Sequence, residues 1–228
     1  MSHSSRAALG ELLGSAGLTL AVVGSGIAAQ RLSPGDTGLQ LFENAFSTAL
    51  ALTVLILVFA SVSGAHFNPV ITVADITLHR EKWAVAAAYI PAQVLGCIGG
   101  AILANVLFGE PAVAWSTTER SGWPLLLSEV VATAGLVVVV FALVRTGRSA
   151  IAAPAVGAYI GAAYFFTSST SFANPAITVG RMFSDTFAGI SPASALPFVA
   201  AQLAGGAVGW LTVRALFPVE TGRVTVEA

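Results

Sequence analysis

Charged residues are scarce in this chain. Only 9% of its 228 residues are Asp, Glu, Lys or Arg, whereas 56% are hydrophobic. Soluble globular domains carry a charge at about one residue in four. So few charges cannot cover a water-facing surface of this size. The composition therefore excludes a soluble globular domain and predicts a protein whose solvent is the lipid bilayer.

Cysteine is almost absent, and neither sign of charge dominates. Cys97 is the single cysteine, so an internal disulfide is excluded, and its apolar neighbours predict inert packing. The formal net charge of −1 offers no basic surface for nucleic acid. No metal-binding or redox motif can be built from one cysteine. We therefore expect no cofactor, no metal, no nucleic-acid partner and no enzymatic activity.

Long apolar runs are abundant instead. A helix needs about 20 apolar residues to cross the hydrocarbon layer. Breaks that contain glycine, proline or charged residues separate the runs. We expect an all-α membrane protein with six transmembrane helices, the first of which is a retained span rather than a signal peptide. The six stretches cover residues 7–30, 41–62, 83–108, 123–144, 150–168 and 193–217.

Two copies of a proline-containing motif lie outside these six spans. The heptads NPVITVA and NPAITVG share five of seven positions and begin 106 residues apart. Asn is a good N-cap and Pro suits the first helical turn, so each heptad predicts the start of a short helix. Residues 68–78 and 174–183 would each cover roughly 15 Å at 1.5 Å per residue, which is too short to cross. The motifs are Asn68, Pro69 and Val70 in the first half and Asn174, Pro175 and Ala176 in the second.

The rest of the chain repeats in the same order. Glu11 heads ELLGSAGL and Glu129 heads EVVATAGL, while Gln93 lies in the third span and Gln202 in the sixth. Each half therefore holds three spans and one short segment. Three is an odd number, so the second half enters the membrane from the opposite side and the repeat is inverted. We expect one domain over residues 1–228, with repeats at approximately 7–108 and 123–217.

Inversion brings the two short segments together, start to start, at the membrane midplane. Each helix start carries roughly half a positive charge and free amide donors, so cations and protons meet a barrier there. Asn68 and Asn174 are expected to donate to the oxygen of a neutral solute. Backbone carbonyls of residues 63–67 and 170–173 would provide acceptors along one wall, with apolar side chains opposite.

These features together resemble the aquaporin and glycerol-facilitator family, also called major intrinsic proteins. The resemblance rests on the SGAHFNPVITVA stretch, the FANPAITVG segment and the inverted repeat. It implies six spans with two re-entrant half-helices, one pore per subunit and a homotetramer. It also implies that Glu11 and Glu129 accept hydrogen bonds from the re-entrant loops, and we expect Gln93 and Gln202 to support the same loops.

The selectivity region departs from the pattern of the family. Most members place an arginine directly after the second Asn-Pro-Ala and an aromatic residue in the second span, which narrow the outer mouth. Family spacing assigns these two places to Ile177 and Thr48. The loop position is Ser171, and the fifth-span position is Ala162 or, in another register, Tyr164. The small and aliphatic set predicts a constriction that is wider and less polar than a water-only filter.

Three further residues bear on this prediction. Arg181 lies one turn beyond Ile177 and is interpreted either as a charge in the outer vestibule or as the partner of Asp185. Val70 places two extra methyl groups near the midplane and is expected to offset part of the widening. His66 is interpreted either as a pore residue on the cytoplasmic side or as a packed, hydrogen-bonded histidine.

We therefore expect a passive channel for water and small uncharged solutes. Polyols such as glycerol, urea-like molecules and neutral metalloid hydroxides such as arsenite are the candidate solutes. A water-selective pore kept narrow by Tyr164 and Arg181 is the alternative. A proton-coupled transporter is less favoured, because only Glu11 and Glu129 are candidates for a proton relay. A purely structural tetramer would leave the two short helices without a purpose.

The distribution of Lys and Arg sets the expected orientation. Seven of the ten basic side chains fall on the side that carries both termini. Basic residues favour the cytoplasmic side of a membrane. We expect a multi-pass protein of the cell membrane, plasma or inner, with both termini in the cytoplasm.

Overall fold

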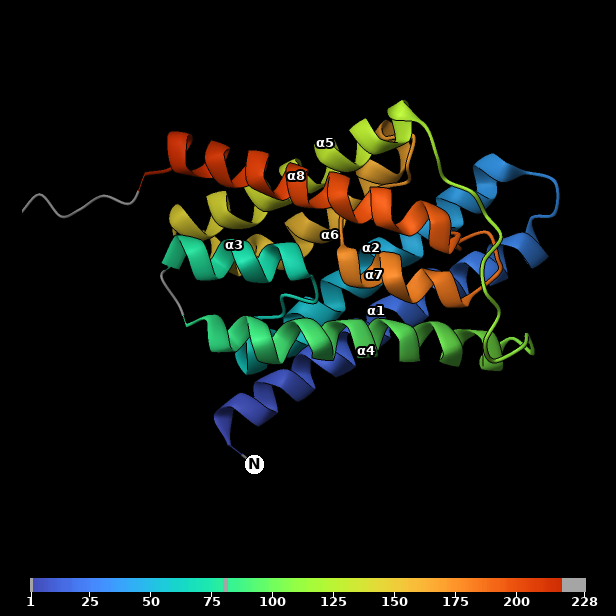
Figure 1. Cartoon of the computed structure of the whole chain (residues 1–228), viewed down its shortest axis with the longest axis horizontal. Helices are drawn as coiled ribbons and strands as arrows, with labels where there is room; N and C mark the ends of the chain where they lie inside the picture. Colours follow the sequence, from blue (N-terminus) through green and yellow to red (C-terminus); the bar gives the residue numbers. More distant parts are fainter. Residues whose placement is uncertain (1, 80–81, 219–228) are drawn as a thin grey trace, which may run out of the picture.

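The computed structural model describes residues 2–79 and 82–218. Six helices in these ranges are long and apolar enough to cross a bilayer, which confirms the predicted fold class (Figure 1). The domain prediction over residues 1–228 extends past the described residues at both ends. The spanning elements are α1 (His3–Leu32), α2 (Thr37–Ser63), α4 (Trp83–Leu107), α5 (Trp123–Arg145), α6 (Ala152–Phe166) with the preceding 3-10 turn η1 (Ser149–Ile151), and α8 (Pro192–Leu216).

Two shorter helices begin at the prolines of the repeated motif. The first is α3 (Pro69–His79), and the second is α7 (Pro175–Gly180), which continues as the 3-10 turn η2 (Arg181–Phe183). Both start where the sequence predicts, because proline has a suitable φ and its missing N–H is not needed in the first turn. In Figure 1 they extend from the middle of the molecule toward opposite ends.

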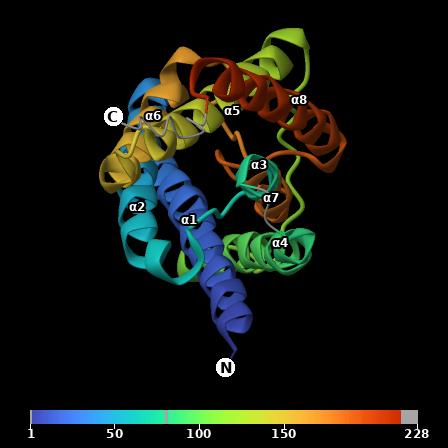
Figure 2. The ribbon, with the colours of Figure 1, turned by 90° about the vertical axis from the view of Figure 1, so that its left-hand side faces the viewer.

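The long helices form a ring around the two short ones (Figure 2). In the first half α1 packs on α2 and α4, and in the second half α8 packs on α5. Contacts between α2 and α6 join the two halves. The start of α1 and the end of α8 lie at one end of the bundle, which we call the terminal end, and the opposite end is the far end (Figure 1). The half-helix α3 leads toward the terminal end and α7 toward the far end.

Glycines allow the helices of each half to approach closely. A side chain at Gly96 on α4 would collide with the carbonyl of Leu12 on α1, and one at Gly205 on α8 would collide with the carbonyl of Val130 on α5. Gly96 and Gly205 each follow the glutamine of their helix by three residues. The repeat therefore uses the same small-residue packing in both halves.

The outer surface of the ring is apolar. Helix α2 exposes Phe42, Phe46 and Leu50 along one side, and α8 exposes Leu196 and Leu211. Such large exposed apolar faces are unusual in water but ordinary against lipid tails. Amphipathic tryptophan rings anchor membrane proteins near helix ends. The exposed Trp83 and Trp123 are the first residues of α4 and α5, and the exposed Trp115 lies in the loop between these helices.

Candidate pore

The side chains of Asn68 and Asn174 cap the two half-helices. The Oδ1 atom of Asn68 accepts from the amide of Val70 at 2.9 Å. The Oδ1 atom of Asn174 accepts from the amides of Ala176 at 2.9 Å and Ile177 at 3.2 Å. These are N-cap bonds, which satisfy donors that a helix start otherwise leaves free.

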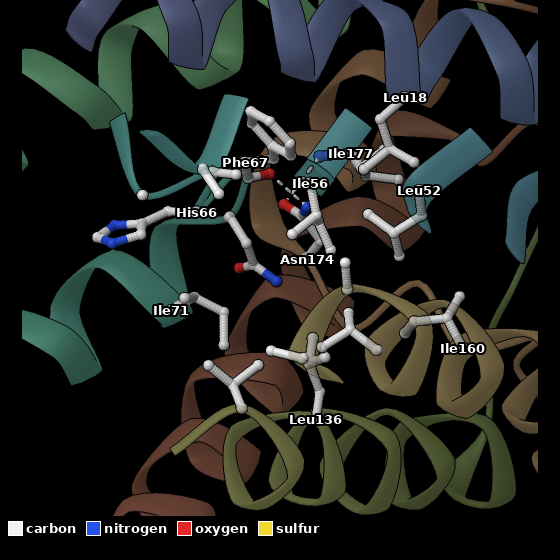
Figure 3. Close-up of a pocket in the computed structure, with 18 of the residues that line it drawn as sticks. Leu18, Leu52, Ile56, His66, Phe67, Ile71, Leu136, Ile160, Asn174 and Ile177 are labelled. Atoms are coloured by element: carbon white, nitrogen blue, oxygen red, sulfur yellow. Dashed lines mark hydrogen bonds between the residues drawn. The ribbon is translucent and has the colours of Figure 1, made fainter. Parts of the chain in front are cut away.

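The same two asparagines tie the half-helices to each other. Nδ2 of Asn68 donates to the carbonyl of Ala173 at 2.7 Å. Nδ2 of Asn174 donates to the carbonyl of Phe67 at 2.7 Å (Figure 3). The two helix starts therefore meet inside the bundle, as the inverted repeat predicts. An amide group has two N–H donors, so one donor of each asparagine remains for a solute.

The crossed bonds change the expected ladder of carbonyl acceptors. The carbonyls of Phe67 and Ala173 are already engaged by asparagine, and the carbonyl of Ser63 accepts from the hydroxyl of Tyr89 at 2.9 Å. The ladder is therefore shorter than the predicted runs of residues 63–67 and 170–173. Lining residues whose carbonyls take no hydrogen bond from the described residues are Gly64, Ala65, His66, Ser171 and Phe172.

The loops before the half-helices adopt a strained backbone that repeats between the halves. Left-handed φ values occur at Gly64, Ala65 and Phe67, and again 106 residues later at Thr170, Ser171 and Ala173. Each non-glycine residue in this region costs on the order of 1–3 kcal/mol and persists only where its surroundings impose it. The left-handed positions recur at equivalent places, so the two loops share one backbone conformation.

Glu11 imposes this backbone on the first loop. Its Oε1 accepts from the Ser63 hydroxyl at 2.6 Å and the His66 amide at 3.0 Å. Its Oε2 accepts from the Phe67 amide at 2.7 Å and from Nε2 of Gln93 at 2.7 Å. Glu11 is fully buried, and four donors satisfy its carboxylate.

Glu129 does the same for the second loop. Its Oε1 accepts from the Ser169 hydroxyl at 2.6 Å and the Phe172 amide at 2.9 Å. Its Oε2 accepts from the Ala173 amide at 2.9 Å and from Nε2 of Gln202 at 2.7 Å. These contacts are the ones that the resemblance implies for both glutamates. A carboxylate that holds four donors is poorly suited to relay protons.

The two glutamines extend the support to the half-helices through threonines that the sequence analysis missed. Nε2 of Gln93 donates to Thr72 at 2.9 Å, and Nε2 of Gln202 donates to Thr178 at 2.8 Å. Thr72 and Thr178 lie 106 residues apart, at the fifth position of each heptad. Their identity in both heptads was the signal that could have identified them.

A cavity of about 680 Å³ runs beside the two helix starts. One wall consists of the loops and the asparagines. The other wall is apolar and comes from four long helices, as Figure 3 shows for several of its side chains. The apolar wall is lined by Leu18, Val22, Leu52, Ile56, Leu136, Val140, Val156 and Ile160.

At the far end the cavity meets a group of hydroxyls. The Thr48 and Tyr164 oxygens lie 3.2 Å apart, and both residues line the cavity with Ser171 and Ile177. Of the two candidates for the fifth-span position, Tyr164 lines the cavity, whereas Ala162 is exposed and is not part of the lining. Ser171 is 3% exposed, and its hydroxyl has no hydrogen-bond partner within residues 2–79 and 82–218.

Arg181 also lines the far end of the cavity. It is only 2% exposed, its Nε donates to the carbonyl of Ala188, and its Cζ lies 3.4 Å from the centre of the Phe172 ring. The alternative partner Asp185 instead accepts from the amide and hydroxyl of Thr117 at 2.8 and 3.0 Å. No ion pair joins Arg181 to Asp185 among the described residues, so the alternative that makes Asp185 its partner is wrong.

A second arginine lies on the same ring. The Cζ of Arg120 is 5.1 Å from the centre of Phe172, and its guanidinium donates to the carbonyls of Gly189 and Phe187 at 2.9 and 3.1 Å. Burial lowers the pKa of Arg120 from its ordinary value. Arg120 does not line the central cavity but a separate hollow at the far end.

Val70 does not narrow the cavity, contrary to expectation. Its side chain packs toward α8, where a Cβ at Gly206 would lie 2.5 Å from Val70 Cγ1. The glycine provides the room for the two extra methyl groups. Val70 is buried and does not line the cavity. The prediction that its methyl groups offset part of the widening is therefore wrong.

At the terminal end the cavity meets His66 and Asp75. His66 Nδ1 lies 3.2 Å from the Thr72 hydroxyl, and its Nε2 lies 3.7 Å from Asp75 Oδ2. Asp75 also accepts from Nδ1 of His79 at 2.7 Å, in the arrangement where that nitrogen is protonated. His66 thus both lines the cavity and is hydrogen-bonded, so its two interpretations hold together.

Comparison with known proteins places this geometry in a family. A family model described as Major intrinsic protein matches residues 1–172. The chain belongs to the major intrinsic protein family. Its relatives include the aquaglyceroporin AqpS of Rhizobium meliloti (strain 1021), which is 44% identical over 200 residues and matches 88% of this chain and 85% of that protein. The probable aquaporin TIP1-2 of Oryza sativa subsp. japonica is 32% identical over 192 residues, covering 79% and 76%.

The fold of this major intrinsic protein also matches a solved structure. The X-ray structure of the aquaglyceroporin from Plasmodium falciparum superimposes with a TM-score of 0.73 and covers 93% of this chain and 96% of that one. At 21% identity this likeness concerns the fold alone. The expectation of an aquaporin-like membrane channel is thus confirmed at the level of family and fold.

Proposed function

We propose that the protein is a passive channel that conducts glycerol and water through the cavity beside Asn68 and Asn174. The observation that carries the proposal is the form of this cavity, about 680 Å³ in volume, with one polar wall and one apolar wall. A solute with hydroxyls on one side and methylene groups on the other fits both walls. The aquaglyceroporin name of the 44% identical relative supports the same solute.

The polar wall is matched to an uncharged solute. Donors of Asn68 and Asn174 and free carbonyls in the two loops can replace part of its hydration shell. The positive ends of the two half-helices repel a cation. An anion would lose hydration water against the apolar wall without a replacement, which is costly. Weak, spaced contacts favour fast exit, which conduction requires.

The residues at the far end favour solutes larger than water but leave a second candidate function. Ile177 provides no guanidinium at the position after Asn-Pro-Ala, which supports a wide constriction. The 3.2 Å contact between Thr48 and Tyr164, with Arg181 on the same cavity, favours a narrower, water-selective pore. A wide constriction would also admit urea-like molecules and neutral metalloid hydroxides such as arsenite.

Swelling of proteoliposomes in graded solutes separates the two. We expect water and glycerol to enter faster than in protein-free vesicles, with urea and arsenous acid as further members of the panel. Fast water entry without glycerol entry would establish the water-selective alternative. No solute entry above the protein-free vesicles would defeat the channel proposal.

The placement of the protein in the membrane is also proposed here. The Lys/Arg distribution supports a cytoplasmic terminal end, in a plasma or inner membrane, and family resemblance supports a homotetramer. Protease protection of terminal tags in right-side-out and inverted vesicles tests the first. The mass of the detergent-solubilised protein, measured by light scattering, tests the second.

A further inference from the structure

At each end of the pore the repeat places a charged side chain against an aromatic ring, but the charge is negative at the terminal end and positive at the far end. Asp75 and Arg181 lie 106 residues apart, and so do His66 and Phe172. In the first half His66 Nε2 lies 3.7 Å from the Asp75 carboxylate, and in the second half the Arg181 guanidinium carbon lies 3.4 Å from the Phe172 ring centre. All four residues line the central cavity. A carboxylate therefore marks the terminal end and a guanidinium the far end.

Two contacts hold the guanidinium of Arg181 in place. Its Nε donates to the carbonyl of Ala188, and its face lies on Phe172. The Phe172 ring is in turn fixed by the edge-to-face contact with Phe198 on α8, with ring centres 5.3 Å apart. An aromatic face attracts a cation without neutralising it. The positive charge consequently has a fixed position beside the lumen.

No carboxylate makes an ion pair with this charge in the described ranges. The ion pairs recorded there involve Arg31, His66 and His79. Arg120 on the same ring adds a second positive charge. The terminal nitrogens of Arg181 make no hydrogen bond to described residues, so its field is directed at whatever passes through the cavity.

Arg181 stands on the same face as Ile177, which lines the cavity without a charge. Four residues of helix separate the two by roughly one turn, about 5.4 Å along the axis. A long arginine side chain can bridge that distance and place its charge near the start of the constriction.

We propose that Arg181, positioned by Phe172, is the cation barrier at the far end of the pore. This assignment rests on the proposed channel function and gives position 181 the charge that position 177 lacks. Cation exclusion then depends on two elements in series, the helix starts at the centre and Arg181 at the far end. Phe172 acts as a positioning residue, because it contacts the guanidinium and fixes its location.

Methylammonium entry into proteoliposomes tests the barrier, with glycerol swelling of the same vesicles as the measure of a folded pore. We expect Arg181→Gln to raise methylammonium entry about tenfold or more, since a unit charge at contact distance changes a barrier by this order. Arg120→Gln removes a charge from the same ring outside the cavity and is the matched control, expected to stay tight. Unchanged entry in R181Q, or equal entry in R120Q, would overturn the proposal.

Two more variants separate charge from packing. Arg181→Lys keeps a positive charge that the Phe172 ring still attracts, so this variant should remain tight. Phe172→Leu removes the ring, so the guanidinium loses its position and the variant should leak several-fold. A leak in R181K equal to that in R181Q would contradict the role of charge. A tight F172L would contradict the positioning role, and these results stand even where R181Q fails to fold.

The experiment also distinguishes this inference from the proposed function. Wild-type vesicles that show no glycerol entry defeat the channel proposal itself. Wild-type vesicles that conduct glycerol, combined with an R181Q variant that still excludes methylammonium, defeat only the assignment of the barrier to Arg181.

Discussion

The two halves of the molecule keep the same polar contacts but distribute side-chain volume differently. The four hydrogen bonds of Glu11 and the four of Glu129 agree within 0.2 Å, donor by donor. At the third motif residue the first half has Val70, which packs against Gly206 of α8, and the second half has the smaller Ala176. The residue of α4 equivalent to Gly206, four positions after the glutamine, is the larger Cys97. Buried polar groups must be satisfied one by one, whereas volume can be moved between neighbours.

The largest effect is expected from breaking the shared polar contacts. Glu129→Ala leaves two backbone amides, a hydroxyl and a glutamine without their acceptor, which should cost about 4 kcal/mol or more in stability. Glu11→Ala should cost a similar amount because its contacts are the same. Thermal unfolding in detergent measures both. Glu110→Gln, at an exposed ion pair, is the control and should change stability by less than about 1 kcal/mol. A mild loss in either alanine variant would refute the bracing role.

The exchange of volume predicts a smaller effect that a second substitution reverses. Gly206→Ala places a methyl group against Val70 and should destabilise the protein by about 2 kcal/mol through overpacking. Val70→Ala in the same chain restores the room and should recover most of that loss. Gly99→Ala on α4, where no atom lies within 4 Å of the added carbon, is the matched control. Additive rather than compensating effects of V70A and G206A would show that the two do not share this space.

The next prediction concerns Ile71 and Ile177, which line the cavity at equivalent places in the two halves. Ile177→Arg introduces a long charged side chain at the constriction and should lower the ratio of glycerol to water permeability about tenfold, or 1.4 kcal/mol. Ile177→Val, which keeps the side chain apolar, serves as the control. Stopped-flow swelling measures the ratio. An unchanged ratio in I177R would mean that residue 177 does not line the constriction.

The smallest change in stability is expected from Ser171→Ala, which gives the second loop the alanine that the first loop has at the equivalent position. Ser171 has the position of Ala65, and both have a left-handed φ. Because the Ser171 hydroxyl has no hydrogen-bond partner among the residues that the structure describes, Ser171→Ala should change stability by less than about 0.5 kcal/mol. Glycerol permeability should fall about two-fold if the hydroxyl contacts the passing solute. A stability loss above 1 kcal/mol would indicate a structural bond that the geometry does not contain.

Features that depend on local chemistry were predictable from the sequence. The apolar runs predict six spans, and the Asn-Pro pairs predict where the half-helices begin. The internal repeat predicts equivalent roles for Glu11 and Glu129. The odd number of spans per half gave the inversion. All of these follow from composition, capping or counting.

Features that depend on three-dimensional packing were not predictable. The register of Tyr164 against Thr48 depends on how residues 167–174 turn back, and their left-handed residues carry no glycine signal in the second loop. The position of Val70 depends on Gly206, more than a hundred residues away. Arg181 was singled out, but its contact with Phe172 required the loop geometry.

The crossed asparagine bonds have a consequence for biosynthesis. Asn68 donates to a carbonyl that lies 105 residues later in the chain. When the first half has emerged from the ribosome, its re-entrant loop lacks the acceptor that completes it. The translocation machinery or the surrounding lipid must tolerate an unfinished lumen until residue 173 arrives. Neither half can complete the hydrogen bonds of its re-entrant loop until the other half is present.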